Sequence, residues 1–180
     1  IPANWTTSRG NALPNGSIQY SIGDKIKLAD KKSMSYVFAY SYSNSNNFAL
    51  VTRREFEEQA TGVITKNELK DSAYTKSILN TGLLNLKFDL GKKTEIQLKT
   101  LYSISADDKV NTRQGKRDMD IESVYNERST NIWYTQNNLL TTQLLGKHDF
   151  KDDWKFNWTL GYSNVKRDIP FLRRMVYQQV

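Results

Sequence analysis

Few residues of this chain could carry catalysis, because its 180 residues include one histidine and no cysteine. His148 precedes Asp149 and serines are frequent, which raises Ser-His-Asp hydrolysis as one chemistry. A nucleophile must lie within hydrogen-bond reach of its base, and no serine is marked by a sharp turn or a motif. The sequence therefore predicts an interfacial His148, no catalytic residue and no enzymatic activity.

Acidic residues at two-residue spacing form a second candidate site. Asp118, Asp120 and Glu122 alternate along the chain, and oxygen ligands at this spacing are typical of the start of calcium-binding loops. The complete pattern fails, since no glycine follows Asp120 at the turn position and no distal bidentate glutamate fits. We expect a solvated charged loop without a metal or another cofactor. A gain in thermal stability on adding calcium would favour the alternative.

A third set of charged side chains flanks Pro170. It consists of Arg167, Asp168 and Arg173. Proline within a sheet is confined to edges, strand starts and bulges, so we expect Pro170 to end a strand and the charged side chains to pair at its rim. This structural role is favoured over substrate binding, and the sequence identifies no substrate-binding residue.

The basic charge of the chain does not predict a nucleic-acid partner. The formal net charge is +7, yet segment 107–128 holds five basic and six acidic residues. Elsewhere, single lysines alternate with apolar residues, as at Lys25, Lys27, Lys87, Lys99 and Lys155. Dispersed lysines on one face of a sheet suit a solvated surface or a water-filled lumen better than a phosphate track.

The elements that position these residues are predicted from the alternation of apolar and polar side chains. In residues 34–42 and 154–162 every second residue is large and apolar, which is the period of a strand with one apolar face. In the fifth segment the alternation is blurred across residues 137–145, which leaves its register open. The predicted strands are 17–28, 34–43, 78–90, 94–105, 130–149 and 154–166.

Two all-β architectures give this alternation. A soluble barrel turns its apolar face inward, whereas an outer-membrane barrel turns it outward to lipid around a polar lumen. Nine residues rise ~23 Å at ~3.3 Å per residue and a tilt of about 40°, close to the ~25 Å apolar band of outer-membrane barrels. Strand length therefore favours a transmembrane barrel.

The connections between the predicted strands alternate between short and long. The short turns are 29–33, 91–95 and 151–153, and the long polar loops are 44–77 and 106–129. A short helix is expected within Thr52–Lys70, where apolar residues fall near helical spacing. In an up-and-down antiparallel meander all the short turns share one end, which is the asymmetry of outer-membrane barrels with short periplasmic turns and long extracellular loops. A compact soluble domain rarely contains structureless loops beyond about 12–15 residues.

Six strands are too few to close a barrel, since single-chain outer-membrane barrels have about eight or more. An open sheet in lipid would leave backbone groups unpaired along two edges, at several kcal/mol per group. We therefore expect the chain to be part of a longer polypeptide or to be completed by other chains.

Several short stretches resemble the TonB-dependent outer-membrane receptors. The stretches are Asn4-Trp5, Ala12-Leu13-Pro14-Asn15, Ile22-Gly23-Asp24, Asn137-Asn138, Gln143–His148, Trp158–Ser163 and Lys166–Arg173. The last stretch is similar to an Arg-Asp-x-Pro-x-x-Arg run that often follows a barrel strand in this family. It departs from the family at Phe171, where an acidic residue is common.

The resemblance implies a fold, a function and partners. The chain would supply about six strands of a barrel of about 22 strands that imports an iron chelate, glycan, peptide or vitamin across the outer membrane of a Gram-negative bacterium. Its partners would be outer-membrane lipid, the rest of the barrel, a plug domain absent here, the TonB complex acting through that plug, and a surface lipoprotein as a further candidate. The alternatives are a soluble β-barrel that binds a ligand or nucleic acid, and an outer-membrane enzyme.

Overall fold

The computed structural model describes residues 7, 10–91, 93–118, 124–150 and 154–179. Within these ranges the chain forms six strands. They are β1 (Gly16–Ala29), β2 (Lys32–Gln59), β3 (Gly62–Leu90), β4 (Thr94–Asp118), β5 (Val124–Asp149) and β6 (Lys155–Gln179). None of the described segments is a helix with the length and hydropathy that crossing a bilayer requires.

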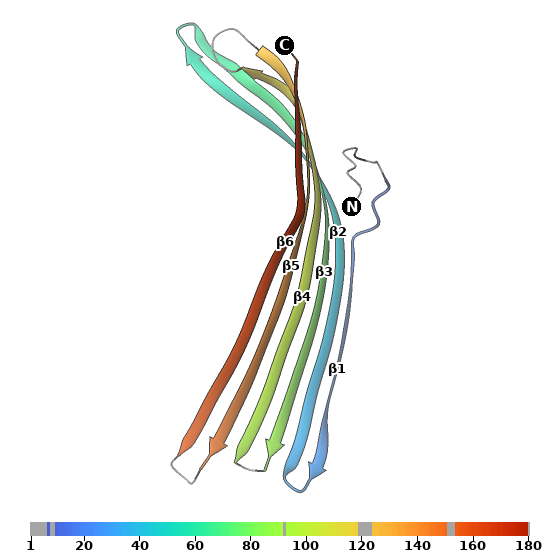
Figure 1. The fold of residues 1–180 in the computed structure, drawn as a ribbon, viewed down its shortest axis with the longest axis vertical. Coiled ribbons are helices and arrows are strands. Elements are labelled where there is room, and N and C mark those ends of the chain that lie inside the picture. The colour runs from blue at the N-terminus through green and yellow to red at the C-terminus, as the bar shows by residue number, and fades with distance from the viewer. Residues whose placement is uncertain (1–6, 8–9, 92, 119–123, 151–153, 180) are drawn as a thin grey trace.

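The six strands form one antiparallel sheet in which each strand pairs with its neighbours in chain order. Figure 1 shows β1 at one edge and β6 at the other, with the connected ends of β1 and β2, of β3 and β4, and of β5 and β6 together at one end. This arrangement confirms the all-β, up-and-down meander that the alternation predicts. The sheet is a single open layer over the described residues, so both of its faces are accessible.

Left-handed backbone conformations form the turns at this end. Asp30 and Lys31 make a two-residue turn between β1 and β2, with Lys31 at a φ of 63°. A positive φ is uncommon for a residue other than glycine and occurs mostly in tight turns. Gly91, at a φ of 92°, begins the connection between β3 and β4, where glycine is the residue that adopts this conformation without strain. The predicted turn at 151–153 lies outside the described residues.

The prediction of long loops is wrong, because the polar segments 44–77 and 106–118 continue the strands. β2 runs to Gln59, which pairs with Gly62 across a two-residue turn, so β2 and β3 have 28 and 29 residues. At ~3.3 Å per residue such strands are ~92 Å long. The alternation of apolar and polar residues does not reveal these strand extensions, because both of their faces are largely polar. The extensions form through backbone hydrogen bonds between strands, which require no apolar side chain.

The short helix expected within Thr52–Lys70 is also wrong, since this segment forms the tip of the β2–β3 hairpin. Its charged side chains pair across the hairpin. Arg54 Nη2 lies 3.2 Å from Glu68 Oε1, and Lys66 Nζ lies 3.5 Å from Glu57 Oε2. Opposite charges on neighbouring positions of two antiparallel strands stabilise their pairing. The charged residues of this segment therefore stabilise a hairpin and not a helix.

Pro170 does not end its strand, contrary to the prediction. β6 continues to Gln179, and the register with β5 shifts so that Ile169 and Pro170 lie opposite Thr135. This two-against-one arrangement is a β-bulge, which is one of the few positions in a sheet that accept proline. The bulge also exchanges the two faces of β6. Before the bulge, even-numbered residues such as Asp168 lie on the face that odd-numbered residues, beginning with Phe171, occupy after it.

We expect substitution of Gly115 to destabilise the contact between β3 and β4. A Cβ at Gly115 would clash with the backbone oxygen of Glu68, whereas a Cβ at Gly82 would meet nothing within 4 Å. Gly115→Ala should lower the free energy of unfolding by ~1–3 kcal/mol, as overpacking does, and Gly82→Ala should cost much less. Denaturant unfolding, with hydrogen exchange of residues 112–118, measures both. Equal losses in the two variants would contradict this account.

Candidate functional site: a sheet with one apolar and one charged face

All six strands contribute large apolar side chains to the same face of the sheet, which we call the apolar face. The register aligns these side chains in rows across the strands. One row consists of Tyr36, Leu86, Leu98, Leu144 and Leu160, and the next consists of Met34, Phe88, Ile96, Gly146 and Trp158. The rows include β5, so the structure supplies the register that the sequence leaves open.

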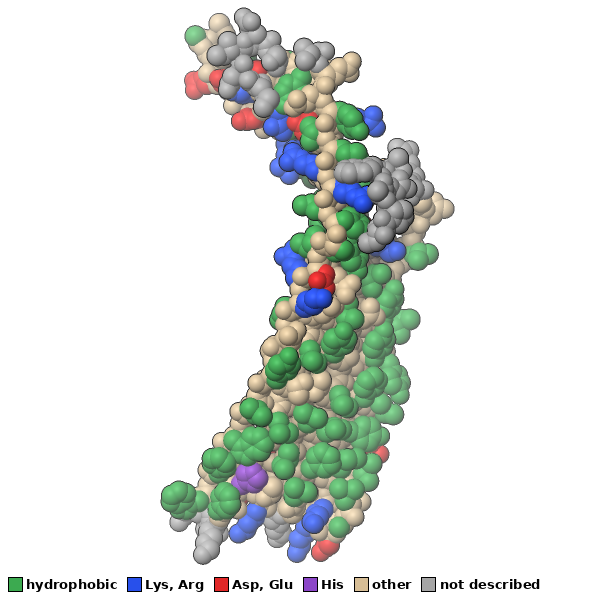
Figure 2. Space-filling view, in the orientation of Figure 1, with side chains coloured by type: hydrophobic (Ala, Val, Ile, Leu, Met, Phe, Trp, Pro, Cys, Tyr) green, Lys and Arg blue, Asp and Glu red, His purple; other side chains and the backbone are tan. Residues whose placement is uncertain are grey.

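The apolar rows form a band of limited height. On β2 the continuous apolar rows run from Met34 to Tyr42. Asn44 and Asn46 follow on the same face, and Phe48 and Leu50 form a separate apolar patch beyond them. Figure 2 shows apolar side chains spread over the lower half of this face. Ile18 is 70% exposed and Leu160 is 67% exposed, because no described residue covers them. Leaving apolar area in water costs about 25 cal/mol per Å², so this band requires an apolar environment that the described chain does not supply.

His148 lies at the short-turn end of the apolar face, among aromatic rings. Its Nε2 accepts a hydrogen bond from Trp158 Nε1 at 3.0 Å, and its Nδ1 lies 3.4 Å from Thr94 Oγ1. Because Nε2 is an acceptor, the proton of the neutral ring is on Nδ1. The ring also stacks with Phe150 and Phe156, at centroid distances of 6.0 and 6.3 Å. Among the described residues, neither ring nitrogen has a serine as its hydrogen-bond partner, so these contacts do not form a catalytic triad.

The opposite face, which we call the polar face, carries an ion-pair network at the same end of the sheet. Ser33 Oγ donates a hydrogen bond to Asp89 Oδ2 at 2.8 Å, and Lys25 Nζ lies 3.4 Å from the same oxygen. Lys87 Nζ lies 3.5 Å from Asp89 Oδ1 and 2.9 Å from Glu95 Oε2. The network links β1, β2, β3 and β4 through alternating charges, which suits contact with water.

A second charged cluster lies on the polar face far above the apolar band. Asp71 of β3 is 3% exposed, and Arg113 of β4 donates to it from Nε at 2.6 Å and from Nη2 at 2.8 Å. Arg53 Nε of β2 lies 3.1 Å from Asp71 Oδ2. The hydrogen bond from Arg113 is the main reason that the pKa of Asp71 is lowered from its ordinary value of 3.8, against the opposing effect of burial. The cluster therefore ties three strands together where few apolar side chains pack.

All the described side chains that are buried lie on the polar face. They are Ser33, Leu69, Asp71, Tyr125, Glu127, Ser129 and Thr135. Glu127 Oε2 lies 2.8 Å from Arg117 Nε, and Glu127 Oε1 has no hydrogen-bond partner among the described atoms. Six of the seven, all except Ser33, lie above the apolar band. Side chains crowd on the inside of a curved sheet, so this distribution indicates that the upper part of the sheet curls toward its polar face.

The rim residues that the sequence predicts do not gather as one group. Neighbouring residues of a strand point to opposite faces, so Arg167 lies on the polar face and Asp168 on the apolar face. The ion pair of Asp168 is with Lys166, whose Nζ lies 3.0 Å from Oδ2. The guanidinium carbon of Arg173 lies 5.6 Å from the centroid of the Phe171 ring.

The predicted calcium candidates are only partly described. Asp118 is the last residue of β4, and its backbone N–H donates a hydrogen bond to Asn67 Oδ1 at 2.9 Å. Asp120 and Glu122 lie outside the described residues. Within the described ranges, no three His, Asp or Glu residues are grouped as a metal site requires.

Sequence reasoning missed the cluster around Asp71. Its members come from three strands, and all three of them, Arg53, Asp71 and Arg113, fall in segments that the sequence predicts to be loops. The signal in the sequence is the presence of single charged residues within polar segments. It predicts a cluster only when the register between the strands is known. No protein-family model matches the chain, and no curated protein matches it. The functional argument therefore depends on the two faces of the sheet and on these clusters.

We expect the hairpin above the apolar band to lose stability in acid through Asp71. A carboxyl whose pKa is lowered by folding contributes its full stability above its unfolded pKa, and that contribution is lost as the pH falls through the folded pKa. Hydrogen-exchange protection of residues 67–75 should therefore be constant near neutral pH and fall below about pH 4. Asp71→Asn should lower the protection at neutral pH and flatten its decline in acid. The exposed control Asp108→Asn should leave the profile unchanged, and the same flattening in this control would refute the assignment.

Proposed function

We propose that the chain forms part of the wall of a TonB-dependent outer-membrane receptor, which imports a nutrient across the outer membrane of a Gram-negative bacterium. The observation that carries the proposal is a band of apolar rows on one face of the sheet, with ion-paired side chains directly behind it. Lipid on one side and water on the other are the two environments that such a sheet requires.

The curvature of the sheet favours a membrane barrel over a soluble one. The buried side chains crowd the polar face, so closure along this curvature by further strands would place the polar face inside. A soluble barrel needs the apolar face inside. In the membrane barrel, Phe38, Leu86 and Trp158 would contact acyl chains. The lysines on the opposite face, Lys87, Lys99 and Lys155, would face a water-filled lumen.

The length of the strands supports a receptor with a tall extracellular wall. The apolar band on β2 ends at Tyr42, and the strand continues for 17 more residues to Gln59 (59 − 42). This extension is ~56 Å long at ~3.3 Å per residue. Because the short turns lie at the opposite end of the band, the extension would rise on the extracellular side, where cargo is first captured.

The open edges of the sheet require further strands. β1 and β6 each pair on one side only within the described chain, and an unpaired backbone group in lipid costs several kcal/mol. The family resemblance supplies the completion, which is a barrel of about 22 strands around a plug that the TonB complex pulls. The cargo would be an iron chelate, a glycan, a peptide or a vitamin.

The surroundings of His148 favour an importer over an outer-membrane enzyme. Both ring nitrogens face Trp158 and Thr94, and in the proposed orientation the ring lies on the lipid side of the wall. Hydrolysis needs a nucleophile and water at the base. The described contacts of this side chain are instead those of an aromatic girdle at the edge of an apolar band.

A charge placed on each face of the same strand tests the proposed orientation. Phe38→Arg puts a cation in the middle of the apolar band, where an outer-membrane barrel loses ~2–4 kcal/mol. Ser41→Arg puts the same charge on the polar face and should cost much less. The free energy of unfolding of the full polypeptide in lipid vesicles measures both. Equal costs would contradict the orientation, and a native protein that is soluble and monodisperse without detergent would overturn the proposal.

A further inference from the structure

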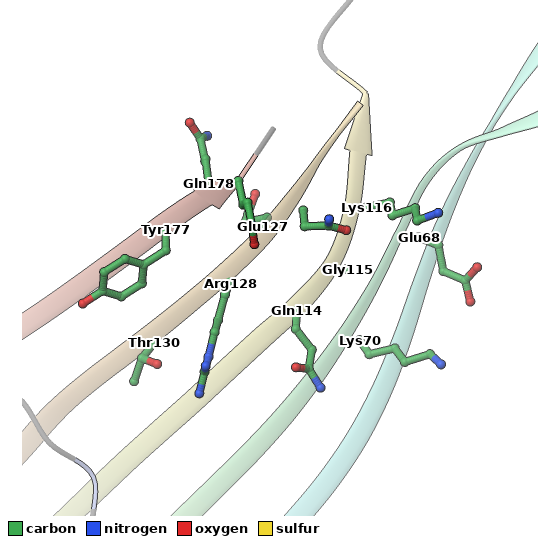
Figure 3. A pocket seen from close by; sticks show the side chains of 12 residues that line it. Glu68, Lys70, Gln114, Gly115, Lys116, Glu127, Arg128, Thr130, Tyr177 and Gln178 are labelled. Atoms are coloured by element: carbon green, nitrogen blue, oxygen red, sulfur yellow. The ribbon is translucent and has the colours of Figure 1, made fainter. Parts of the chain in front are cut away.

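A shallow depression of about 980 Å³ lies far above the apolar band, on the same side of the sheet as the apolar face. Two adjacent rows of the register line it. They are Lys70, Gln114, Arg128 and Tyr177, followed by Glu68, Lys116, Asn126 and Gln179. Figure 3 shows Lys70, Gln114 and Arg128 extending to one side of their strands. Four strands, β3 to β6, therefore contribute to one site.

The depression holds positive charge that the described residues do not neutralise. Its exposed cations are Lys70, Lys116 and Arg128, and none of them has an ion-pair partner in the part of the chain that the structure describes. The carboxylate of Glu68 is 3.2 Å from Arg54, and that of Glu127 lies on the opposite face, 2.8 Å from Arg117. Cations gathered in a hollow attract an anionic ligand.

The uncharged residues of the depression suit a sugar. The amides of Gln114, Asn126 and Gln179 both donate and accept hydrogen bonds, as sugar hydroxyls require. The ring of Tyr177 is 63% exposed and offers a flat apolar surface for the C–H face of a pyranose. Its hydroxyl lies 3.9 Å from Met175 Sδ, to which it donates. An aromatic plate beside amides and cations matches an acidic saccharide better than a bare anion.

The height of the depression excludes a lipid headgroup as the ligand under the proposed function. The top row of the apolar band includes Asn80 of β3, Ile104 of β4 and Asn138 of β5. On each of these strands the residue that lines the depression, which is Lys70, Gln114 or Arg128, lies ten residues further along the strand. Ten residues span ~33 Å, or ~25 Å of height at a tilt of about 40°. The headgroup layer adds only ~5–8 Å beyond the hydrocarbon, so lipid phosphates are too low.

We infer that this depression is a binding site for an acidic oligosaccharide. The carboxylate or sulfate groups of the sugar pair with Lys70, Lys116 and Arg128, and one sugar ring stacks on Tyr177. The same chemistry occurs in a free oligosaccharide and in the sugar chain of a surface glycolipid. The site is defined by its own residues and goes beyond the proposed import function.

Calorimetry on the full polypeptide in detergent tests the site with oligogalacturonate hexamer and with uncharged maltohexaose. We expect the acidic hexamer to bind at least tenfold more tightly, with an affinity that falls as salt is added. The variant K70Q/K116Q/R128Q should lose at least tenfold in affinity for the acidic hexamer. The control K27Q/K76Q/R174Q, with the same change in charge at exposed positions elsewhere, should stay within twofold of the wild type. Tyr177→Ala should weaken hexamer binding about fivefold and leave the weak binding of inorganic sulfate unchanged.

Equal affinity for the two hexamers, or equal losses in the two triple variants, would overturn the inference. Vesicles carrying lipopolysaccharide should compete with the hexamer if a glycolipid is the source, and only the free hexamer should bind if it is not. Competition by phosphatidylglycerol vesicles of equal charge would overturn the site as a sugar site. A polypeptide that binds the acidic hexamer as described but remains soluble without detergent would refute the proposed membrane function and leave this inference intact.

Discussion

The structure depends on the register of its backbone ladder. Side chains alternate between faces, so a slip of one residue between two strands would carry a whole apolar row to the charged face. The row that includes Tyr36, Leu86 and Leu98 holds its place across three separate hairpins. Two of the register shifts, at Glu55/Phe56 and opposite Thr135, lie above the rows that run from Met34 to Tyr42 on β2, so they leave those rows intact.

Two different sets of interactions hold the lower and upper parts of the same strands together. In the lower part the apolar face gains stability only when something apolar covers it, and the polar face is joined by pairs such as Lys87 with Glu95. In the upper part Asp71 and Arg113 form a two-point ion pair on the crowded face. Carboxylate–guanidinium pairs of this geometry are among the stronger polar contacts. Strands of one sheet can therefore cross from one solvent environment into another.

The sequence predicts the part of the sheet that has one apolar face and misses the part in which both faces are largely polar. Residues 34–42 and 154–162 alternate cleanly because one face must be apolar, and the structure places both in strands with the expected faces. Residues 44–59 and 62–77 carry polar side chains on both faces, so their strands follow from pairing with a partner and not from their own pattern. The Asp71 cluster and the saccharide depression join residues from separate strands, so neither could be recognised before the register was known.

The central claim is that the apolar face meets lipid while the polar face meets water, and neighbouring residues of one strand test it most directly. The chain has no cysteine of its own, so Leu86→Cys and Lys87→Cys each add one labelling site to it. Any cysteine elsewhere in the full polypeptide is replaced by serine before the nitroxide label is attached and the protein is placed in lipid vesicles. Power-saturation spectroscopy then compares collisions with oxygen, which concentrates in lipid, and with a water-soluble nickel complex. We expect the label at position 86 to be relaxed by oxygen and the label at position 87 by nickel. Nickel access at both positions, or burial of position 86 from both reagents, would contradict the account.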